Sequence, residues 1–304
     1  MKVMLDRRNL VIYHRVDYDG IFSGCIAEKS LESRGMRVEV LGWNYSDPLP
    51  DIQKLKNQYA TITMVDISFP ADVMLDLRDT WKLTWIDHHI TAIDDSIKFG
   101  YSDIPGLRKI GLAACELCWN FYYPHSQVPP LIQMLSSYDV WNKDRFNWED
   151  DIMPLQYGLK TRYGINYQKI YADFDYLLSR YDEVLDDGFA VYSYLKDTWK
   201  SWAKNCSFEV LVDRKYKGIC MLSPMSGSSC FQSVSSQYEV YLVANIRNNG
   251  QVYSLSMYKD SPDIIPEFSC GEYLKQFGGG GHSSAAGSDI SKEVFSRLIF
   301  EHQI

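Results

Sequence analysis

The sequence predicts an α/β protein with an N-terminal domain around a parallel sheet, a connector helix, and a smaller mixed α/β C-terminal domain. Short apolar runs alternate with helical stretches in the first part of the chain, which is typical of a parallel sheet. After residue 207 the sequence becomes β-rich. The length of 304 residues exceeds what one hydrophobic core usually serves. We therefore expect two domains, over residues 1–200 and 207–304, with the connector helix ending the first.

The first elements follow the order strand, loop, helix. Residues 10–15 (LVIYHR) predict a buried strand, and the helix after the DYDG segment is expected to end at Gly35. Three more strands are predicted over 38–43 (VEVLGW), 61–68 (TITMVDIS) and 83–89 (LTWIDHH). In such sheets the polar residues that close the strands gather at one edge, where open α/β folds bind ligands.

Helical periodicity dominates from about residue 110 to 205, and residues 168–203 are expected to form the connector helix. The strands predicted after it are FEVLVD, KGICMLS, YEVYLVANIR and VYSLSMY. The last two flank Asn249-Gly250, which predicts a hairpin turn.

The charge balance limits the class of partner. Lys and Arg total 31 against 39 Asp and Glu, for a formal net charge of -8, whereas nonspecific binders of long nucleic acid usually present a basic face. We therefore expect no long duplex DNA partner. A small anionic substrate stays compatible, because metal ions and a few basic side chains can reverse the local potential. The sequence leaves a homodimer open.

The chain is expected to be cytoplasmic. No long apolar segment marks its N-terminus and no run of about 18 apolar residues occurs, so neither secretion nor a membrane partner is expected. The seven Cys are scattered, which is typical of buried free thiols in a reducing compartment. Cys115 and Cys118 form a CxxC pair at helical spacing among apolar residues, so we favour core packing over a metal site for them.

Four segments that end or follow predicted strands carry Asp or His, and together they suggest a metal site. They are His14-Arg-Val-Asp17-Tyr-Asp19-Gly20, Val65-Asp66-Ile67-Ser68, Ile86-Asp87-His88-His89 and Tyr138-Asp139-Val140-Trp141. Asp17 and Asp19 are two residues apart and can face one cavity, and Gly20 allows a tight entry into the helix. Carboxylates and imidazoles without a thiolate favour Mn²⁺ or Mg²⁺ over structural zinc.

Each carboxylate alone has a simpler interpretation. An Asp after a strand is commonly a helix N-cap, so Asp66 or Asp17 alone would indicate little. The triplet Asp87-His88-His89 differs, because three consecutive polar side chains after the apolar strand LTWI need partners, which a metal would supply. We therefore favour one metal site for the four segments together.

In their order the motifs resemble those of the DHH phosphoesterase superfamily, named for the triplet that Asp87-His88-His89 matches. HRVDYDG resembles its first motif, VDIS its second, IDHH its third and SSYDVW its fourth, and FGGGGHSSAAG at 277–287 resembles the signature of its associated substrate-binding domain. The resemblance implies a DHH catalytic domain over 1–200 and a DHH-associated domain over 207–304. The chain resembles most the nanoRNase or oligoribonuclease-like branch of this superfamily, which is related to RecJ and to exopolyphosphatases.

The resemblance also implies a role for each site residue. One metal ion would be held by His14, Asp17 and Asp66, and the other by Asp19, Asp66, His88 and Asp139. Several relatives space the first His differently or use an Asp there. Asp87 would orient a neighbouring imidazole, and His89 would face the substrate phosphate or a metal-bound water. The expected cofactor is two Mn²⁺ ions, with Mg²⁺ or Co²⁺ as substitutes; cations about 3.5–4 Å apart would activate a bridging hydroxide.

The glycine run of the C-terminal domain is expected to bind phosphate. Backbone N–H groups of Gly279, Gly280 and Gly281 would approach the anion, with His282 in reach; a turn between helix and strand is the alternative. Further candidate phosphate contacts are Arg247 and Lys259, with ordinary surface charge as the alternative. Relatives commonly have an Arg near the position of Tyr258 or Lys259, so substrate recognition is expected to differ.

We predict a divalent-metal-dependent phosphodiesterase that acts on short oligoribonucleotides or small nucleotide phosphates, with Asp87, His88 and His89 as catalytic residues. The first alternative, an exopolyphosphatase or pyrophosphatase, would need a cleft crowded with Lys and Arg, whereas basic clustering near the glycine run is modest. The second is a catalytically inactive nucleotide-binding regulator, although all the carboxylates and both His of the triplet are present.

Overall fold

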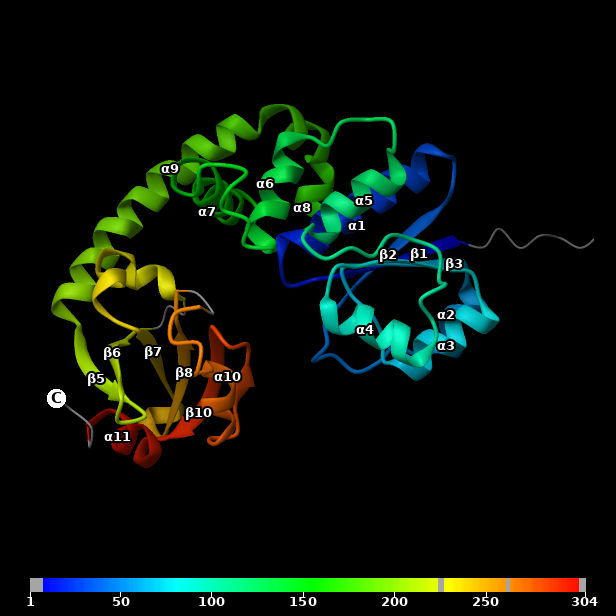
Figure 1. Ribbon diagram of the computed structural model, residues 1–304. Helices are drawn as coiled ribbons and strands as arrows, with labels where there is room; N and C mark the ends of the chain where they lie inside the picture. Colours follow the sequence, from blue (N-terminus) through cyan, green and yellow to red (C-terminus); the bar gives the residue numbers. More distant parts are fainter. Residues whose placement is uncertain (1–7, 224–226, 261–262, 301–304) are drawn as a thin grey trace, which may run out of the picture. The chain divides into compact units, whose positions relative to one another are not determined.

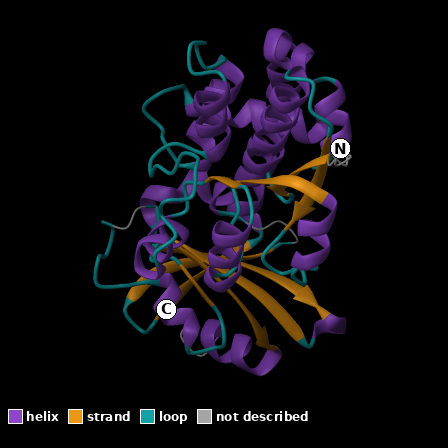
Figure 2. Ribbon diagram, turned by 90° about the vertical axis from the view of Figure 1, so that its right-hand side faces the viewer, coloured by secondary structure: helices purple, strands orange, loops and turns teal. Residues whose placement is uncertain are grey.

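The structure is a computed structural model that describes residues 8–223, 227–260 and 263–300. The chain divides into two compact units, Met1–Tyr192 and Ser193–Ile304. Their boundary lies within the long helix α9 (Phe174–Asn205). Each unit contains a sheet with helices packed on it, as Figure 1 and Figure 2 show. The predicted α/β class, with a parallel N-terminal sheet and a C-terminal unit of strands and helices, is confirmed.

A four-stranded parallel sheet forms the centre of the N-terminal unit, in the strand order β2-β1-β3-β4. The strands are β1 (Arg8–His14), β2 (Val38–Trp43), β3 (Tyr59–Val65) and β4 (Leu83–Ile86). His14 pairs with Trp43 and Val65 with Ile86, so all four strands end at the same edge. Two predicted strands end three residues early, at Val65 and Ile86, and Asp66 leaves the strand with a positive φ of 60°.

Helices cover both faces of this sheet (Figure 1). One face carries α1 (Tyr18–Ser33) and α5 (Ala114–Tyr122), and the other carries α2 (Ile52–Gln58), α3 (Ala71–Thr80) and α4 (Ile90–Phe99). Successive residues of β1 enter different cores, because Val11 and Tyr13 pack on the α1 side while Leu10 and Ile12 pack on the opposite side. Burial on both faces explains why the strands read as nearly continuous apolar runs.

The remaining helices of this unit are α6 (Pro130–Asp139), α7 (Met153–Arg162), α8 (Tyr167–Ala172) and the first part of α9. The stretch predicted as one connector helix over 168–203 forms two helices, α8 and α9, and Arg180 interrupts the helical dihedrals of α9. Cys115 and Cys118 of α5 are fully buried, so their interpretation as core residues is confirmed.

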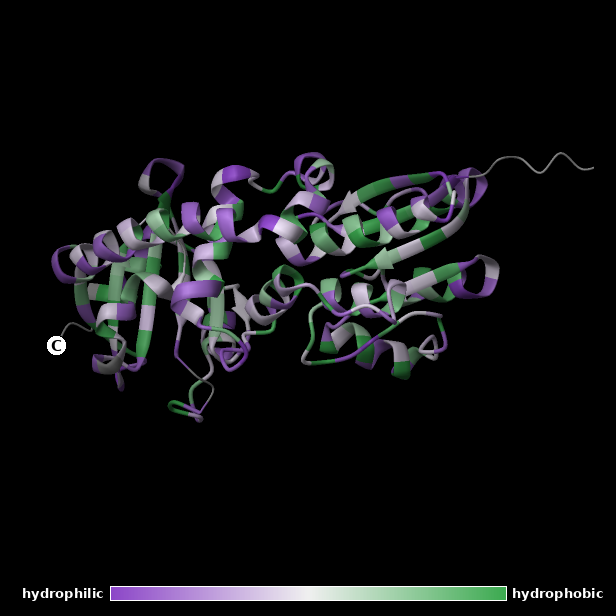
Figure 3. Ribbon diagram, turned by 90° about the horizontal axis from the view of Figure 1, so that it is seen from above, coloured by the Kyte–Doolittle hydropathy of each residue, from purple (hydrophilic) through white to green (hydrophobic). Residues whose placement is uncertain are grey.

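The C-terminal unit contains a six-stranded sheet in the order β5-β6-β7-β8-β10-β9. Its elements are β5 (Ser207–Val212), β6 (Tyr216–Leu222), β7 (Val240–Arg247), β8 (Val252–Tyr258), α10 (Cys270–Lys275), β9 (Gly280–Gly281), β10 (Ala285–Ser291) and α11 (Lys292–Phe300). The predicted hairpin around Asn249-Gly250 joins β7 to β8 and is confirmed. Figure 3 shows that strand residues of both sheets are largely hydrophobic. Among the described residues, no helix combines the length and apolarity that a membrane span requires.

Candidate metal centre

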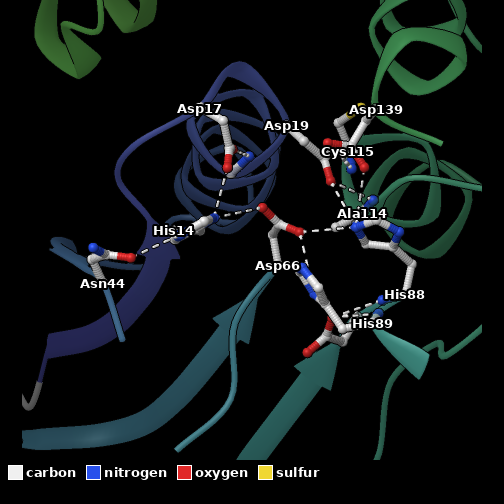
Figure 4. Close-up of polar contacts among 12 residues, drawn as sticks. His14, Asp17, Asp19, Asn44, Asp66, His88, His89, Ala114, Cys115 and Asp139 are labelled. Carbon is white, nitrogen blue, oxygen red and sulfur yellow. Dashed lines mark hydrogen bonds and ion pairs between the residues drawn. The ribbon is translucent and has the colours of Figure 1, made fainter. Parts of the chain in front are cut away.

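The ends of three parallel strands and of two helices bring together the metal ligands predicted in the N-terminal unit (Figure 4). His14 is the last residue of β1, Asp66 follows β3, and the triplet Asp87-His88-His89 follows β4. Asp17 caps helix α1, Asp19 lies in its first turn, and Asp139 is the last residue of α6. Segments that are far apart in the sequence therefore converge on one edge of the sheet.

Asp66 lies at the centre of this cluster and is almost completely buried, with 2% of the residue exposed. Its Oδ2 is 3.4 Å from His14 Nδ1, and its Oδ1 is 3.3 Å from His88 Nε2. The left-handed backbone of Asp66, with φ 60°, costs on the order of 1–3 kcal/mol. Its N–H donates to the Ile86 carbonyl at 2.9 Å, which ties this turn to the end of β4. The strained turn thus directs one carboxylate oxygen to each half of the cluster.

The first half consists of His14, Asp17 and Asp66. His14 Nε2 lies 3.1 Å from the Asn44 side-chain oxygen, which can only accept, so Nε2 carries a proton and Nδ1 is the ring nitrogen available to a metal ion. Nδ1 is 2.7 Å from Asp17 Oδ2, but their alignment does not form a hydrogen bond. Gly20 is required here, because a Cβ atom on it would lie 2.0 Å from the His14 carbonyl oxygen.

The second half consists of Asp19, His88 and Asp139, with Asp66 shared. His88 Nε2 lies 3.5 Å from Asp19 Oδ2 and 3.2 Å from Asp139 Oδ2. Asp19 also accepts the backbone N–H groups of Ala114 and Cys115, at 2.9 and 2.7 Å, at the start of α5. Neighbouring ligands of an octahedral ion with bonds of about 2.1 Å lie about 3.0 Å apart. The spacing of these atoms is therefore close to that of a coordination shell.

Asp87 acts on the site through its neighbours rather than by direct contact. It is fully buried, accepts from the Trp85 indole N–H at 3.1 Å, and accepts from the backbone N–H groups of His88 and His89. Its Oδ1 also lies 2.7 Å from His89 Nδ1. The carboxylate therefore fixes the orientation of His89, whose side chain is 37% exposed. Of the three predicted catalytic residues, Asp87 has a positioning role.

The electrostatics of the cluster indicate a deficit of positive charge. Burial, reinforced by neighbouring carboxylates, raises the pKa of Asp66 and of Asp139 to about 7 and places the pKa of Asp19 well above its ordinary value. Burial lowers the pKa of His14, but Asp17 and Asp66 outweigh it and raise that pKa to about 10. The bond to Asp87 raises the pKa of His89 to about 9. Additional cations would relieve this repulsion.

Two buried atoms in the cluster lack hydrogen-bond partners within the described part of the chain: His14 Nδ1 and Asp66 Oδ1. Buried polar atoms are rarely left in this way, so each points to a missing ligand. Carboxylate oxygens and imidazole nitrogens without thiolates suit Mn²⁺, Mg²⁺ or a similar ion. The residues present therefore fit a pair of divalent cations with Asp66 between them.

The structure corrects the prediction that Lys259 contacts phosphate. This residue is 5% exposed, and its ammonium donates to the carbonyl oxygens of Ile264, Ile265 and Phe268 at 3.1, 3.2 and 2.7 Å. An ammonium has three protons to donate, and these three carbonyl groups can accept all of them. Lys259 holds the loop before α10 in place.

The prediction of a shared phosphate site requires Arg247 to lie beside the glycine run, but the two are far apart on the sheet. Arg247 pairs with Val252 at one end of β8, whereas Gly281 pairs with Ala286, which pairs with Met257 near the other end. Five residues of strand at about 3.3 Å each separate these positions by about 17 Å. The Arg247 guanidinium lies 3.9 Å from Asp289 instead.

The glycine run forms an ordered turn from α10 into β9 rather than an open cradle of N–H groups. Gly279 N–H donates to the Leu274 carbonyl at 3.0 Å, and His282 N–H donates to the Ala285 carbonyl at 2.7 Å. A Cβ atom on Gly279 would lie 2.3 Å from the Gly287 carbonyl oxygen, so close packing explains this glycine. The N–H groups of Gly279 and His282 are therefore already paired, whereas the His282 side chain is exposed.

Sequence reasoning missed Asn44, Trp85 and the start of α5 as parts of the site. Asn44 directly follows β2, at the same strand edge as the ligands. Its position after a predicted strand could have indicated that it belongs to the site. Nothing in the local sequence indicates that the N–H groups of Ala114 and Cys115 bind Asp19, because 95 and 96 residues separate them.

Comparison with known proteins identifies the fold. No family model matches the sequence, and no curated protein matches it. Among solved structures, the pGpG-specific phosphodiesterase PggH from Vibrio cholerae is similar over 96% of both chains, with a TM-score of 0.60 and 13% identity. The DHH domain of a protein described as a member of a family of ribosomal proteins is similar over 98% of this chain and 88% of that chain, with a TM-score of 0.58 and 13% identity.

RecJ from Thermus thermophilus, in complex with Mn²⁺, is similar over 96% of this chain and 51% of that chain, with a TM-score of 0.52 and 16% identity. These similarities cover both units of the present chain. The first three motifs that carry the resemblance lie at the ends of β1, β3 and β4, the fourth lies at the end of α6, and the glycine motif lies in the C-terminal unit. The chain therefore has the fold of the DHH superfamily.

Proposed function

We propose that the protein is a divalent-metal-dependent phosphoesterase that hydrolyses short oligoribonucleotides or small nucleotide phosphates. The observation that carries this proposal is the position of Asp66, whose two oxygens face His14 and His88 in two groups of ligand atoms. The unpartnered His14 Nδ1 supports it. The similar folds of a pGpG-specific phosphodiesterase and of Mn²⁺-bound RecJ support a nucleotide substrate and this metal.

The proposed cofactor is a pair of Mn²⁺ ions, for which Mg²⁺ or Co²⁺ could substitute. His14 and Asp17 would hold one ion and Asp19, His88 and Asp139 the other, with Asp66 shared. When bound, such a pair neutralises phosphate oxygens and lowers the pKa of a water molecule between the ions.

His89 has the exposure and orientation to contact the substrate directly. Asp87 holds its Nδ1 at 2.7 Å, which leaves Nε2 on the other side of the ring to face a ligand. Asp87 raises the pKa of His89 to about 9 in the absence of metal, and a protonated Nε2 would donate to a phosphate oxygen. In the C-terminal unit, the proposed phosphate contacts are Gly280, Gly281 and the side chain of His282.

The test is hydrolysis by the full chain, stripped with EDTA and then supplied with Mn²⁺. The substrates are pGpG, pApA, longer RNA, cyclic dinucleotides, pyrophosphate and polyphosphate. We expect metal-dependent release of mononucleotides from pGpG or pApA. His88→Ala should abolish it, whereas His125→Ala, at an exposed position of the α5–α6 connection, should leave it unchanged. Hydrolysis of polyphosphate alone would contradict the substrate class, and inertness on the whole panel would favour a nucleotide-binding regulator.

A further inference from the structure

A hollow of about 350 Å³ adjoins the candidate metal centre within the N-terminal unit. Asp17, Asp19 and Asp139, all candidate ligands, form part of its wall. A group that occupies this hollow would therefore lie next to a ligand bound at the metal centre. Its volume lies near the lower end of the range of small-molecule sites, which is about 300–1,000 Å³.

One face of helix α7 forms another part of the wall. It contributes Met153, Gln156, Tyr157 and Lys160, which are spaced by three and four residues and so lie along one side of the helix. The helix is fixed by close packing on α9, because a Cβ atom on Gly158 would lie 1.9 Å from the Val184 carbonyl oxygen. This part of the wall is therefore held in place against α9.

The ring of Tyr157 is held by a second contact. It stacks on Tyr192 with ring centroids 5.5 Å apart and an interplanar angle of 14°. Tyr138 of α6 lines the same hollow and stacks on Trp148, with centroids 5.8 Å apart and the same angle of 14°. Of the three tyrosines that line the hollow, Tyr18, Tyr138 and Tyr157, the last two are thus each stacked on another ring.

The chemistry of the lining matches a nucleoside better than an inorganic chain. Nucleobases stack on aromatic side chains, and a Gln amide can both donate to and accept from the polar edge of a base. Inorganic polyphosphate would need cations along its length, whereas Lys160 carries the single positive charge among the described residues that line the hollow.

We propose that this hollow is the nucleoside subsite next to the scissile phosphate, and that it holds one nucleobase with its ribose. Tyr138 and Tyr157 form its aromatic walls, Gln156 binds the edge of the base, and Lys160 attracts a phosphate. This inference rests on the proposed phosphoesterase function, because the metal centre is what places the phosphate at the end of the hollow.

The test uses neutral nucleosides and the EDTA-treated full chain, so that neither metal nor catalysis is needed. Binding of adenosine, guanosine, cytidine and uridine is measured by isothermal titration calorimetry. Gln156→Leu removes the polar contact. Ile165→Trp narrows the hollow from a lining position that is 49% exposed, and Ile97→Trp, at a position of α4 that is 68% exposed, is its matched control.

We expect at least one nucleoside to bind wild type and Ile97→Trp with equal affinity, and to bind Gln156→Leu and Ile165→Trp at least tenfold more weakly. Unchanged affinity in either of the last two variants, or no binding of any nucleoside to wild type, overturns the proposal. Kinetic measurements distinguish a failure of the subsite proposal from a failure of the proposed function. A wild type that binds nucleosides in the hollow but hydrolyses no phosphoester contradicts only the function. A wild type that hydrolyses pGpG or pApA with a KM unchanged in both variants contradicts only the subsite.

Discussion

Replacing Asp66 by Asn should stabilise the metal-free protein and abolish its stabilisation by Mn²⁺. Asp66 is 2% exposed, and burial raises its pKa from 3.8 to about 7. At about 1.4 kcal/mol per pKa unit, keeping it ionised at pH 8 costs about 4 kcal/mol. The contact with His14 lowers this pKa and is already contained in that cost, so an Asn side chain, which is never ionised, should gain about 4 kcal/mol at pH 8. Asn also tolerates the positive φ of this position.

The gain should depend on pH in a defined direction. Because the folded pKa of Asp66 lies above its unfolded value, the cost is absent below about pH 4, grows as the pH rises, and is complete above about pH 7. Urea denaturation of EDTA-treated wild type and Asp66→Asn should therefore show the full gain in stability at pH 8 and a clearly smaller gain at pH 5. Asp94→Asn, an exposed position on α4, is the control and should change neither value.

Addition of Mn²⁺ provides the second half of this experiment. At a concentration 100 times its dissociation constant, a ligand stabilises the folded state by about 2.7 kcal/mol. For a unit of this size that corresponds to a rise in Tm of about 5–10 °C, which Asp66→Asn should not show. A variant that is less stable than wild type without metal at pH 8, or that keeps the full Mn²⁺ shift, would refute the reasoning.

Other consequences can be measured on single variants or on wild type. In EDTA the wild-type Tm should fall as the pH rises from 5 to 9, because the raised pKa values of Asp66, Asp139, His14 and His89 all favour the protonated folded state; a flat or rising curve by scanning fluorimetry is the contrary result. His88→Ala should lower Mn²⁺-dependent hydrolysis by more than about 100-fold, the upper end for outer-shell residues, and near-normal turnover would remove His88 from the site. Asn44→Leu should weaken Mn²⁺ binding by about 10–100-fold in calorimetry, because His14 Nε2 loses its acceptor; wild-type affinity would contradict the assigned tautomer. Lys259→Met should lower the free energy of unfolding by at least about 2 kcal/mol, because buried carbonyl groups lose their donor, and unchanged urea denaturation would argue against this role.

Much of the N-terminal site could be predicted from sequence because its chemistry follows the strands. Parallel strands deliver the residues after them to one edge, so Asp66, Asp87 and His88 could be placed together from local patterns alone. Asp139 was grouped with them by residue type as if it followed a strand, but it is the last residue of helix α6, so the strand-edge argument did not place it. Asn44 escaped prediction because its role depends on the β1–β2 register, in which His14 pairs with Trp43.

The C-terminal predictions were weaker because charge alone does not say where a side chain lies. Arg247 and Lys259 both looked like cations near a glycine run. The strand register pairs Arg247 of β7 with Val252, at the end of β8 that is far from the glycine run. The segment 264–268 folds back over Lys259 and buries its ammonium group. Glycine itself is ambiguous, because a phosphate cradle and a tight turn both need it, and Gly279 serves close packing.

The most direct test is a crystal structure of the full chain grown with Mn²⁺, with anomalous scattering recorded at the manganese edge. Two peaks about 3.5–4 Å apart are expected on either side of Asp66, one beside His14 and Asp17 and the other among Asp19, His88 and Asp139. An absence of peaks between these side chains, or manganese bound only elsewhere, would contradict the proposed centre.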